Sequence, residues 1–263
     1  MSELTKHLYE AVGRHFVSLS CVQWIPDERR EQICLFSGFL ADISGIWFYI
    51  TAGHNLKAIA KGLDAGYTFN TWRLDDSTAG HKFDQGIPID FNLDHWLVIE
   101  NEDEGLDYAA LPLHILYARQ LEVGGATPIA HIAWGDHVMD HDHWALVGVP
   151  YETVTYSDQN FIRARNVFAP LKPAGEPEAA GTKAQNQFYA KLQDDPKGVV
   201  ANIGGMSGGP IFAFKKVESE WRYSVIGVQS GWYKESRTIA ACPFSTFALE
   251  LQRLVETARN TAD

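Results

Sequence analysis

Short apolar runs separated by turn-forming residues dominate the chain. Eight of these runs have the length and the β-branched and aromatic content of strands, at 16–22, 34–41, 46–52, 95–100, 143–149, 209–214, 223–229 and 238–242. Glycines or acidic turns separate them, as is typical of strands that are joined by tight connections. The pattern predicts an all-β protein.

Helical spacing marks the two ends of the chain. Near the N-terminus, Leu4, Leu8, Ala11 and Val12 fall on one helical face. Near the C-terminus, Ser245 is a suitable helix cap, and the apolar face that follows it consists of Phe247, Leu251, Leu254, Val255 and Ala258. We therefore expect a short N-terminal helix and a C-terminal helix over 245–260. Residues 170–187 are mostly Pro, Gly, Ala and charged residues, and they predict an exposed loop.

Length and charge limit the classes of protein to consider. The chain has 263 residues, of which 46% are hydrophobic, enough to bury a core as one large domain or as two small domains packed as a unit. Every apolar run is shorter than the 18 or more residues of a membrane span, so no membrane partner is expected. The formal net charge of −11 argues against a nucleic-acid partner, because phosphate contacts need Lys and Arg.

The cysteines and the N-terminal segment predict a cellular compartment. Cys21, Cys34 and Cys242 are odd in number and lack the spacing of metal ligands, so a disulfide framework is not expected. Small buried apolar residues are the simplest interpretation of all three. Residues 1–22 lack the cationic start and the unbroken apolar stretch of a signal peptide. These features predict a reducing, cytoplasmic location.

One short stretch, GGMSGGPIF at 204–212, surrounds a serine with four glycines. Glycine loses more conformational freedom on folding than any other residue, so such a cluster is costly unless something must approach the backbone closely. A tight turn before a strand is the simpler interpretation of an isolated SGG. The alternative is that Ser207 is a nucleophile, and the rest of the chain has to decide between the two.

Two further stretches supply the base and the orienting carboxylate that a serine nucleophile needs. ITAGHN at 50–55 puts His54 at the end of an apolar strand, and LDYAAL at 106–111 puts Asp107 at the start of another. GMSGG also fits the nucleophile elbow of α/β-hydrolases, but their histidine follows the serine and the last histidine here is His143. The subtilisin order needs an aspartate before the histidine, and the two aspartates before His54 lie in turn-like, polar settings. The order His, Asp, Ser on a β-rich chain remains.

These stretches resemble the signatures of trypsin-like serine proteases, which have the chymotrypsin fold. TAGH (51–54) resembles their T-A-[AG]-H, the segment at 106–111 resembles their D-[IVLY]-A-[LV], and GMSGGP (205–210) resembles their G-D-S-G-G-P. IGVQSGW (226–232) resembles the strand that lines their substrate cleft. The resemblance covers nearly the whole chain, from about Phe16 to the C-terminal helix.

The resemblance implies a single trypsin-like peptidase domain over 1–263. It would consist of two packed six-stranded antiparallel β-barrels, at about 15–115 and 125–244, with the cleft between them and the C-terminal helix at 245–260. The implied activity is that of a serine endopeptidase without cofactor or metal, acting on a protein or peptide substrate through an acyl-enzyme. Ser207 would attack the carbonyl carbon, His54 would take its proton, and Asp107 would hold the imidazole. The backbone N–H groups of Gly205 and Ser207 would form the oxyanion hole.

The chain departs from digestive members of this family next to the serine. Those relatives carry an aspartate just before the serine, which pairs with a new N-terminus released by cleavage; here the position is Met206 and there is no I-V-G-G-like start. Ile203 replaces the cysteine that usually precedes the glycine turn. Both changes resemble the bacterial cytoplasmic or HtrA-type branches. Since 56 residues follow Ser207, we expect no PDZ domain.

The resemblance also indicates a substrate pocket. Its floor, six residues before the serine, is Ala201, which carries no acid to select Arg or Lys. Ser230, Gly231 and Trp232 would form the cleft wall, with Trp232 narrowing it. A small or apolar residue before the scissile bond is therefore expected. The acidic residues at 100–104 would attract basic substrate residues, or they are simply a solvated turn.

Two alternatives stay open at this stage. His137, His141 and His143, with Asp140 and Asp142, are zinc-ligand types within seven residues, although a polar surface loop is the simpler interpretation. For function, the alternative is a catalytically silent or gated protein-binding module on the protease fold. A cytoplasmic protease needs restraint, which a narrow cleft, a regulatory protein partner or a stimulus would provide.

Overall fold

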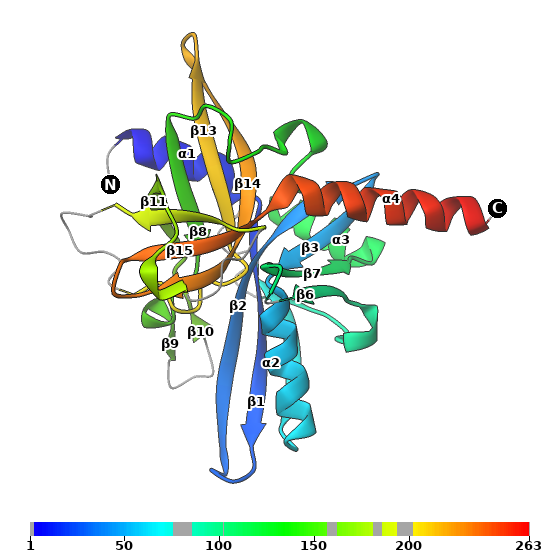
Figure 1. Ribbon diagram of the computed structural model, residues 1–263. Helices are drawn as coiled ribbons and strands as arrows, with labels where there is room; N and C mark the ends of the chain where they lie inside the picture. Colours follow the sequence, from blue (N-terminus) through cyan, green and yellow to red (C-terminus); the bar gives the residue numbers. More distant parts are fainter. Residues whose placement is uncertain are drawn as a thin grey trace.

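The computed structural model is mostly β-structure, with helices at both ends of the chain (Figure 1). It describes residues 3–75, 86–101, 103–156, 162–180, 186–193 and 202–262. The two largest β units are an antiparallel sheet from the first half of the chain and a closed barrel from the second. Within the described residues, no helix has both the length and the apolar character that crossing a membrane requires.

The first unit is a seven-stranded antiparallel sheet in the order β5-β4-β1-β2-β3-β7-β6. Its strands are β1 (Phe16–Ile25), β2 (Arg30–Ile43), β3 (Ile46–Thr51), β4 (Thr68–Asp75), β5 (Ile87–Pro88), β6 (Leu97–Asn101) and β7 (Leu106–Pro112). β1 and β2 form a long hairpin, in which Phe16 pairs with Phe39 and Ile25 with Arg30. Two helices follow strands of this sheet, α2 (Gly53–Asp64) after β3 and α3 (Ile115–Gly124) after β7.

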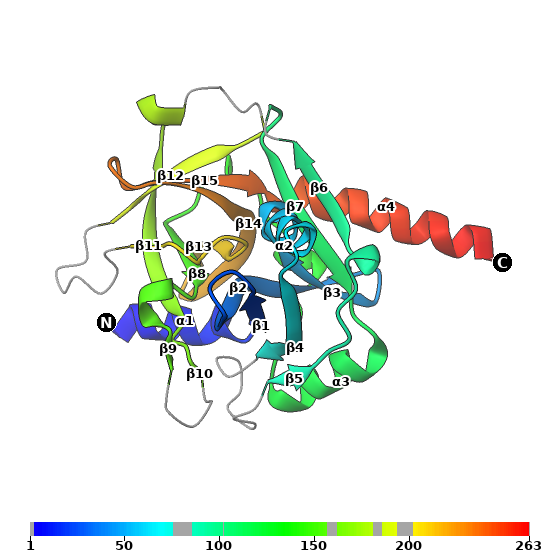
Figure 2. The same ribbon diagram turned by 90° about the horizontal axis from the view of Figure 1, so that it is seen from below.

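The second unit is a closed six-stranded barrel in the order β11-β12-β15-β14-β13-β8. Its strands are β8 (His143–Gly148), β11 (Val167–Ala174), β12 (Phe188–Leu192), β13 (Pro210–Val217), β14 (Glu220–Tyr233) and β15 (Thr238–Pro243). A separate two-stranded ribbon, β9 (Thr155–Tyr156) with β10 (Ile162–Arg163), lies between β8 and β11 in the chain. Figure 2 shows the barrel on one side of the molecule and strands β3, β6 and β7 on the other.

A shared apolar core holds the two units together. Phe39 from β2, Phe212 from β13 and Phe244 from the start of α4 belong to one buried cluster. The rings of Phe39 and Phe244 meet edge to face with centroids 5.2 Å apart, an arrangement that aromatic pairs prefer. Each unit also has a cluster of its own, around Leu19 in the sheet and around Leu146 in the barrel.

The predicted terminal helices both form. α1 (Glu3–Gly13) buries Leu8 and Val12, and the Tyr9 hydroxyl donates a hydrogen bond to Asn166 Oδ1 on the barrel side. α4 (Phe244–Ala262) buries Phe247 and Leu251 but leaves Leu254 53% exposed. Figure 1 shows why the apolar face ends early, because the second half of α4 projects away from the body.

The prediction of an exposed loop over 170–187 is wrong for residues 170–174, and residues 181–185 lie outside the described residues. β11 runs through 167–174 and pairs with both β8 and β12. Leu171 in its middle is only 1% exposed. Pro170 and Pro173 misled the prediction, because proline is rare in strand interiors. Among the described residues, four short 3-10 helices connect these elements, at η1 (Leu93–His95), η2 (His131–Ala133), η3 (Tyr151–Thr153) and η4 (Glu178–Ala180).

His15, to which the sequence assigns no role, is a buried structural histidine. It is 3% exposed, and its Nδ1 lies 2.6 Å from the Thr127 carbonyl oxygen. Because that oxygen can only accept, Nδ1 carries the proton and Nε2 accepts from the Tyr223 hydroxyl at 2.8 Å. Burial lowers the pKa of His15 to about 4, and the charge of Arg14 adds to this effect.

Acidification is therefore expected to destabilise the protein through His15. The neutral form is favoured in the fold, so the unfolded chain takes up the proton first as the pH falls through about 6.5. The free energy of unfolding should decline between pH 6.5 and 4, by about 3 kcal/mol in total. Urea unfolding at several pH values in this range measures the effect. The free energy of unfolding should fall more steeply with decreasing pH in the wild type than in His15→Gln, whose side chain at position 15 cannot titrate. Equal slopes would refute the assignment.

Candidate active site

The register of the first sheet brings His54 and Asp107 together. In the antiparallel pair β3–β7, Thr51 lies opposite Ala109. Continuing that register puts Asp107 opposite residue 53, one position before His54 in the first turn of α2. A Cβ added to Gly53 would come within 3.1 Å of Asp107 Oδ1 and within 3.0 Å of the Tyr108 carbonyl. Glycine thus permits the close approach of α2 to β7.

Two hydrogen bonds join His54 to Asp107. His54 Nδ1 lies 2.7 Å from Asp107 Oδ2, and the His54 backbone N–H donates to Oδ1 at 2.8 Å. The Asp107 side chain is 11% exposed and that of His54 is 39% exposed. A carboxylate that accepts from Nδ1 fixes the tautomer in which Nε2 is free to accept a proton.

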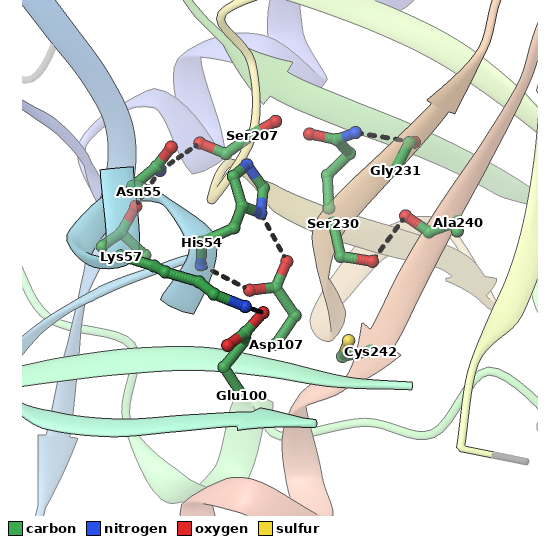
Figure 3. A network of polar contacts seen from close by, with 12 residues as sticks. His54, Asn55, Lys57, Glu100, Asp107, Ser207, Ser230, Gly231, Ala240 and Cys242 are labelled. Atoms are coloured by element: carbon green, nitrogen blue, oxygen red, sulfur yellow. Dashed lines mark hydrogen bonds and ion pairs between the residues drawn. The ribbon is translucent and has the colours of Figure 1, made fainter. Parts of the chain in front are cut away.

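Ser207 comes from the second unit, in the turn that precedes β13. Figure 3 shows the imidazole of His54 between the Asp107 carboxylate and Ser207. Ser207 is half-buried. Among the described residues its hydroxyl makes no hydrogen bond to His54 Nε2. The structure therefore brings all three predicted residues to one place, with the Asp–His contact formed and the Ser–His contact open.

Three residues that the sequence analysis missed connect the Ser207 turn to the first unit. Asn55 Nδ2 donates to the Ser207 carbonyl at 3.2 Å and to Thr51 Oγ1 at 3.0 Å. Thr51 Oγ1 donates to the Ser37 carbonyl at 2.8 Å. The Ser37 hydroxyl donates to the Gly205 carbonyl at 3.0 Å. Thr51 is the first residue of the TAGH motif and Asn55 directly follows the motif, but no pattern in the sequence marks Ser37.

Gly208 shows how closely the two units approach at this turn. Its φ is +87°, a conformation that suits glycine. A Cβ there would lie 2.1 Å from Thr51 Oγ1 and 2.5 Å from the Ser37 carbonyl. The Gly208 N–H donates to the Gln229 carbonyl at 2.8 Å, which ties the turn to β14. These contacts explain part of the glycine cluster around Ser207.

The predicted oxyanion donors, Gly205 N–H and Ser207 N–H, have no hydrogen-bond acceptor within the described residues. The Gly204 carbonyl accepts from the Tyr151 N–H at 2.8 Å, and the Met206 carbonyl accepts from the Gly209 N–H at 2.9 Å. In a trans peptide the N–H points opposite to the carbonyl. Both free N–H groups therefore point away from the contacts that hold the turn.

Met206 and Ile203, the two departures from the family pattern, are apolar core residues here. Met206 is fully buried and Ile203 is 1% exposed, both in the cluster of the barrel. A Cβ added to Gly148 would lie 2.9 Å from Met206 Cβ. Apolar packing thus holds the turn in this chain.

The predicted cleft wall lies in β14. Ser230 Oγ accepts from Gln187 Nε2 at 3.2 Å and donates to the Ala240 carbonyl at 3.4 Å. The Gly231 carbonyl accepts from Gln229 Nε2 at 2.8 Å. Trp232 is half-buried against the barrel cluster, and its buried Nε1 has no hydrogen-bond partner among the described residues. Ala201, the predicted floor, lies outside the described residues.

The histidine-rich segment 137–143 spreads its side chains over different partners. His141 Nε2 donates to the Asp136 carbonyl at 2.8 Å, and the His137 ring stacks on Phe188 with centroids 4.4 Å apart. Lys215 Nζ contacts Asp140 at 2.7 Å and Asp142 at 3.2 Å. In the part of the chain that the structure describes, no three His, Cys, Asp or Glu side chains gather as metal ligands would.

Chelation is therefore expected to leave the protein unchanged. With free metal at 100 times the Kd of such a site, bound metal would add about 2.7 kcal/mol to the free energy of unfolding. Removing the metal would therefore lower Tm clearly. Tm measured with and without EDTA should coincide, for the wild type and for His141→Ala alike. A fall in Tm on chelation that His141→Ala reproduces would establish a metal site.

Comparison with known proteins rests on structure alone. No protein-family model and no curated protein sequence matches the chain. Kallikrein-related peptidase 10 superposes with a TM-score of 0.51 at 12% identity, over 94% of this chain and 98% of that chain. The chain has the chymotrypsin fold.

Two further solved structures have lower scores. A thermostable serine protease, AL20, from an extremophilic microorganism is 17% identical with a TM-score of 0.45, over 94% of this chain and 99% of that chain. The catalytically inactive tobacco etch virus protease complexed with substrate is 8% identical with a TM-score of 0.44, over 89% of this chain and 80% of that chain.

The chymotrypsin fold confirms the predicted fold class, with one difference in detail. The second unit is the closed six-stranded barrel that the resemblance implies. In the described residues the first unit is instead a seven-stranded sheet with β5 and β6 at its ends, and not a closed six-stranded barrel. In this chymotrypsin fold, His54 and Asp107 come from the first unit and Ser207 from the second. The candidate site therefore lies where the two units meet.

Proposed function

We propose that the protein is a serine endopeptidase that hydrolyses peptide bonds through His54, Asp107 and Ser207. The observation that carries the proposal is that two hydrogen bonds join Asp107 to His54 beside Ser207. A carboxylate that holds Nδ1 of a half-exposed imidazole, next to a serine in a glycine turn, is the arrangement that activates a hydroxyl. The fold is compatible with this chemistry but does not by itself establish it.

In the proposed mechanism, Ser207 Oγ attacks the scissile carbonyl carbon while His54 Nε2 takes its proton. Asp107 keeps the imidazole in the correct tautomer and stabilises the imidazolium. The Gly205 and Ser207 N–H groups, free of other acceptors, donate to the oxyanion of the tetrahedral intermediate. His54 then gives its proton to the leaving amine, and water hydrolyses the acyl-enzyme by the same steps.

The alternative function is a silent or gated binding module. The absence of a hydrogen bond between Ser207 Oγ and His54 Nε2 in the described residues favours this alternative. Such contacts are also often long in enzymes without substrate and tighten in the complex. We propose that a protein partner or a stimulus restrains the enzyme and that it acts in a bacterial cytoplasm. The three free thiols fit a reducing compartment.

The test is cleavage of a proteome-derived peptide library by the purified protein beside its Ser207→Ala variant. Endopeptidase activity predicts new peptide termini with the wild type only. A fluorophosphonate probe added in parallel should label Ser207 covalently. Labelling without cleavage would favour a gated enzyme, and neither labelling nor cleavage would favour the silent module.

We further propose that the enzyme prefers substrates with a small or medium apolar residue directly before the scissile bond. Trp232 takes up volume along the proposed wall, and the floor position Ala201 offers no counter-charge to a guanidinium. Leaving such a charge desolvated and unpaired is costly. Within the acidic segment 100–104, Glu100 lies in β6 and its carboxylate contacts Lys57 at 2.6 Å, and Glu102 lies outside the described residues. A solvated turn remains the simpler interpretation of the acidic residues that follow the strand.

The expected cleavage preference can be measured with a positional-scanning peptide library. Preferences of roughly 10- to 200-fold are expected, because one methylene in an apolar pocket is worth only about 1–3 kcal/mol. Trp232→Gly should extend the preference toward larger side chains. A dominant preference for Arg or Lys in the wild type would show that an acid reaches the pocket and that Ala201 is not its floor.

A further inference from the structure

Two cysteines face each other across the hairpin β1–β2. Cys21 and Cys34 are directly opposed in the antiparallel register, so their side chains lie on the same face of the sheet. Directly opposed residues have Cβ atoms about 4.5–5.5 Å apart, close to the 3.5–4.5 Å of a disulfide. Both thiols are free. A bond between them would require a shift of about 1 Å.

The thiol pair borders a cavity of about 900 Å³. The cavity is lined by the hairpin, by Ala58 and Ile59 of α2, and by Tyr151 from the second unit. Figures 1 and 2 show the hairpin running beside α2, and Phe69, Asn70, Thr71 and Arg73 of β4 complete the lining of the cavity. A small polar reagent can therefore reach the pair.

The two thiols differ in environment. Cys21 is 2% exposed, whereas Cys34 is half-buried. The neighbouring thiol of Cys21 lowers the pKa of Cys34, and the neighbouring thiol of Cys34, together with burial, raises the pKa of Cys21. The Cys34 thiol donates a hydrogen bond to Gln23 Oε1 of β1 at 3.2 Å, and Gln32 Nε2, from the same strand as Cys34, donates to that oxygen at 2.6 Å. Cys34 is thus the reactive member and Cys21 the buried neighbour.

Cys242 provides a contrast within the same chain. It is fully buried, and its thiol donates to the Gly105 carbonyl at 3.1 Å. Burial, with a smaller effect of Asp107, raises the pKa of Cys242 to about 12. It lines no part of the cavity. A thiol in this setting is inert.

We propose that Cys34 and Cys21 form an oxidation site for hydroperoxides, whose product is a cross-strand disulfide between them. The Cys34 thiolate attacks the terminal peroxide oxygen, so an S–O bond forms as the O–O bond breaks, and the leaving oxygen departs as an alcohol or water. Cys34 is then a sulfenic acid. Cys21 attacks its sulfur, an S–S bond forms, and the S–O bond breaks to release water. Two thiols and one hydroperoxide give one disulfide, one alcohol or water, and one further water.

The test is peptide mapping of the full chain after treatment with a small molar excess of hydrogen peroxide. The intact mass should fall by two hydrogen atoms, with the linkage between the peptides that contain Cys21 and Cys34. Cys242 should remain alkylatable after unfolding, and Cys242→Ala should form the same bridge. Dithiothreitol should restore both thiols. In Cys21→Ala, Cys34 should stop at sulfenic acid, which dimedone traps.

Several results would overturn the proposal. One is oxidation of Cys34 no faster than that of Cys242 in the native protein. Another is a product in which Cys34 is sulfinic acid while Cys21 is still a free thiol. Disulfides between chains instead of within one chain would also contradict it. Because the decisive map uses the wild-type protein, failure of a cysteine variant to fold would not obscure the answer.

Discussion

Replacing His54 by alanine is expected to lower kcat by about 10⁶-fold, the order seen when a triad base is removed. His54 is the base that Asp107 positions beside Ser207, so without its imidazole the Ser207 hydroxyl has no base to take its proton. Ser207→Ala should cost about as much, and the double variant should be no worse than either single one, because the two residues act in one step. Initial rates on a peptide identified by the library measure all three.

The control for this series is His95→Ala, since His95 is exposed and outside the candidate site. It should keep the wild-type kcat. Labelling by the fluorophosphonate should be lost in His54→Ala. If labelling persisted at full stoichiometry in that variant, another group would be the base and the triad assignment would be wrong.

Changing Asp107 to asparagine is expected to lower kcat by about 10⁴-fold at neutral pH. Asp107 accepts two hydrogen bonds from His54, one from the ring and one from the backbone. An amide in its place can donate to Nδ1, which would put the proton on Nε2 and leave no base facing Ser207. The fold should survive, because asparagine has nearly the same volume.

Glu100→Gln is a matched control for Asp107→Asn. Glu100 lies directly opposite Asp107 in the β6–β7 pair, and its carboxylate binds Lys57 instead of His54. The same chemical change one strand away should alter kcat by less than about tenfold, as expected for a partly exposed ion pair. Comparable losses in both variants would mean that general electrostatics, and not the tautomer of His54, explain the effect.

Most strands could be predicted from the sequence, because half-buried β-structure leaves a strong local pattern. The runs at 46–52 and 238–242 became β3 and β15 nearly within their predicted bounds. The sequence pattern does not predict α2, although Leu56 and Ile59 are buried at helical spacing, because Gly53 and Gly62 lower the helix propensity of this stretch. β11 was missed because Pro170 and Pro173 resemble loop residues, and only its two neighbouring strands reveal it.

The candidate site divides in the same way. The order His54, Asp107, Ser207 can be predicted from the sequence because each residue stands in a short motif with chemical meaning. The distances between these side chains in space cannot be predicted, since 53 residues separate His54 from Asp107 and 100 separate Asp107 from Ser207. Only the register of Thr51 with Ala109 puts the carboxylate beside the imidazole.

The amino-acid sequence predicts an all-β chain with terminal helices and with a serine, a histidine and an aspartate in a recognisable order. These features depend on local spacing and side-chain chemistry, which are written in neighbouring residues. The tertiary structure alone decided that Ser37, Thr51 and Asn55 join the two units at the serine turn. It also decided that Cys21 faces Cys34 and that the first unit has seven strands. Such contacts depend on strand pairing and on packing between distant segments, and no local pattern encodes either.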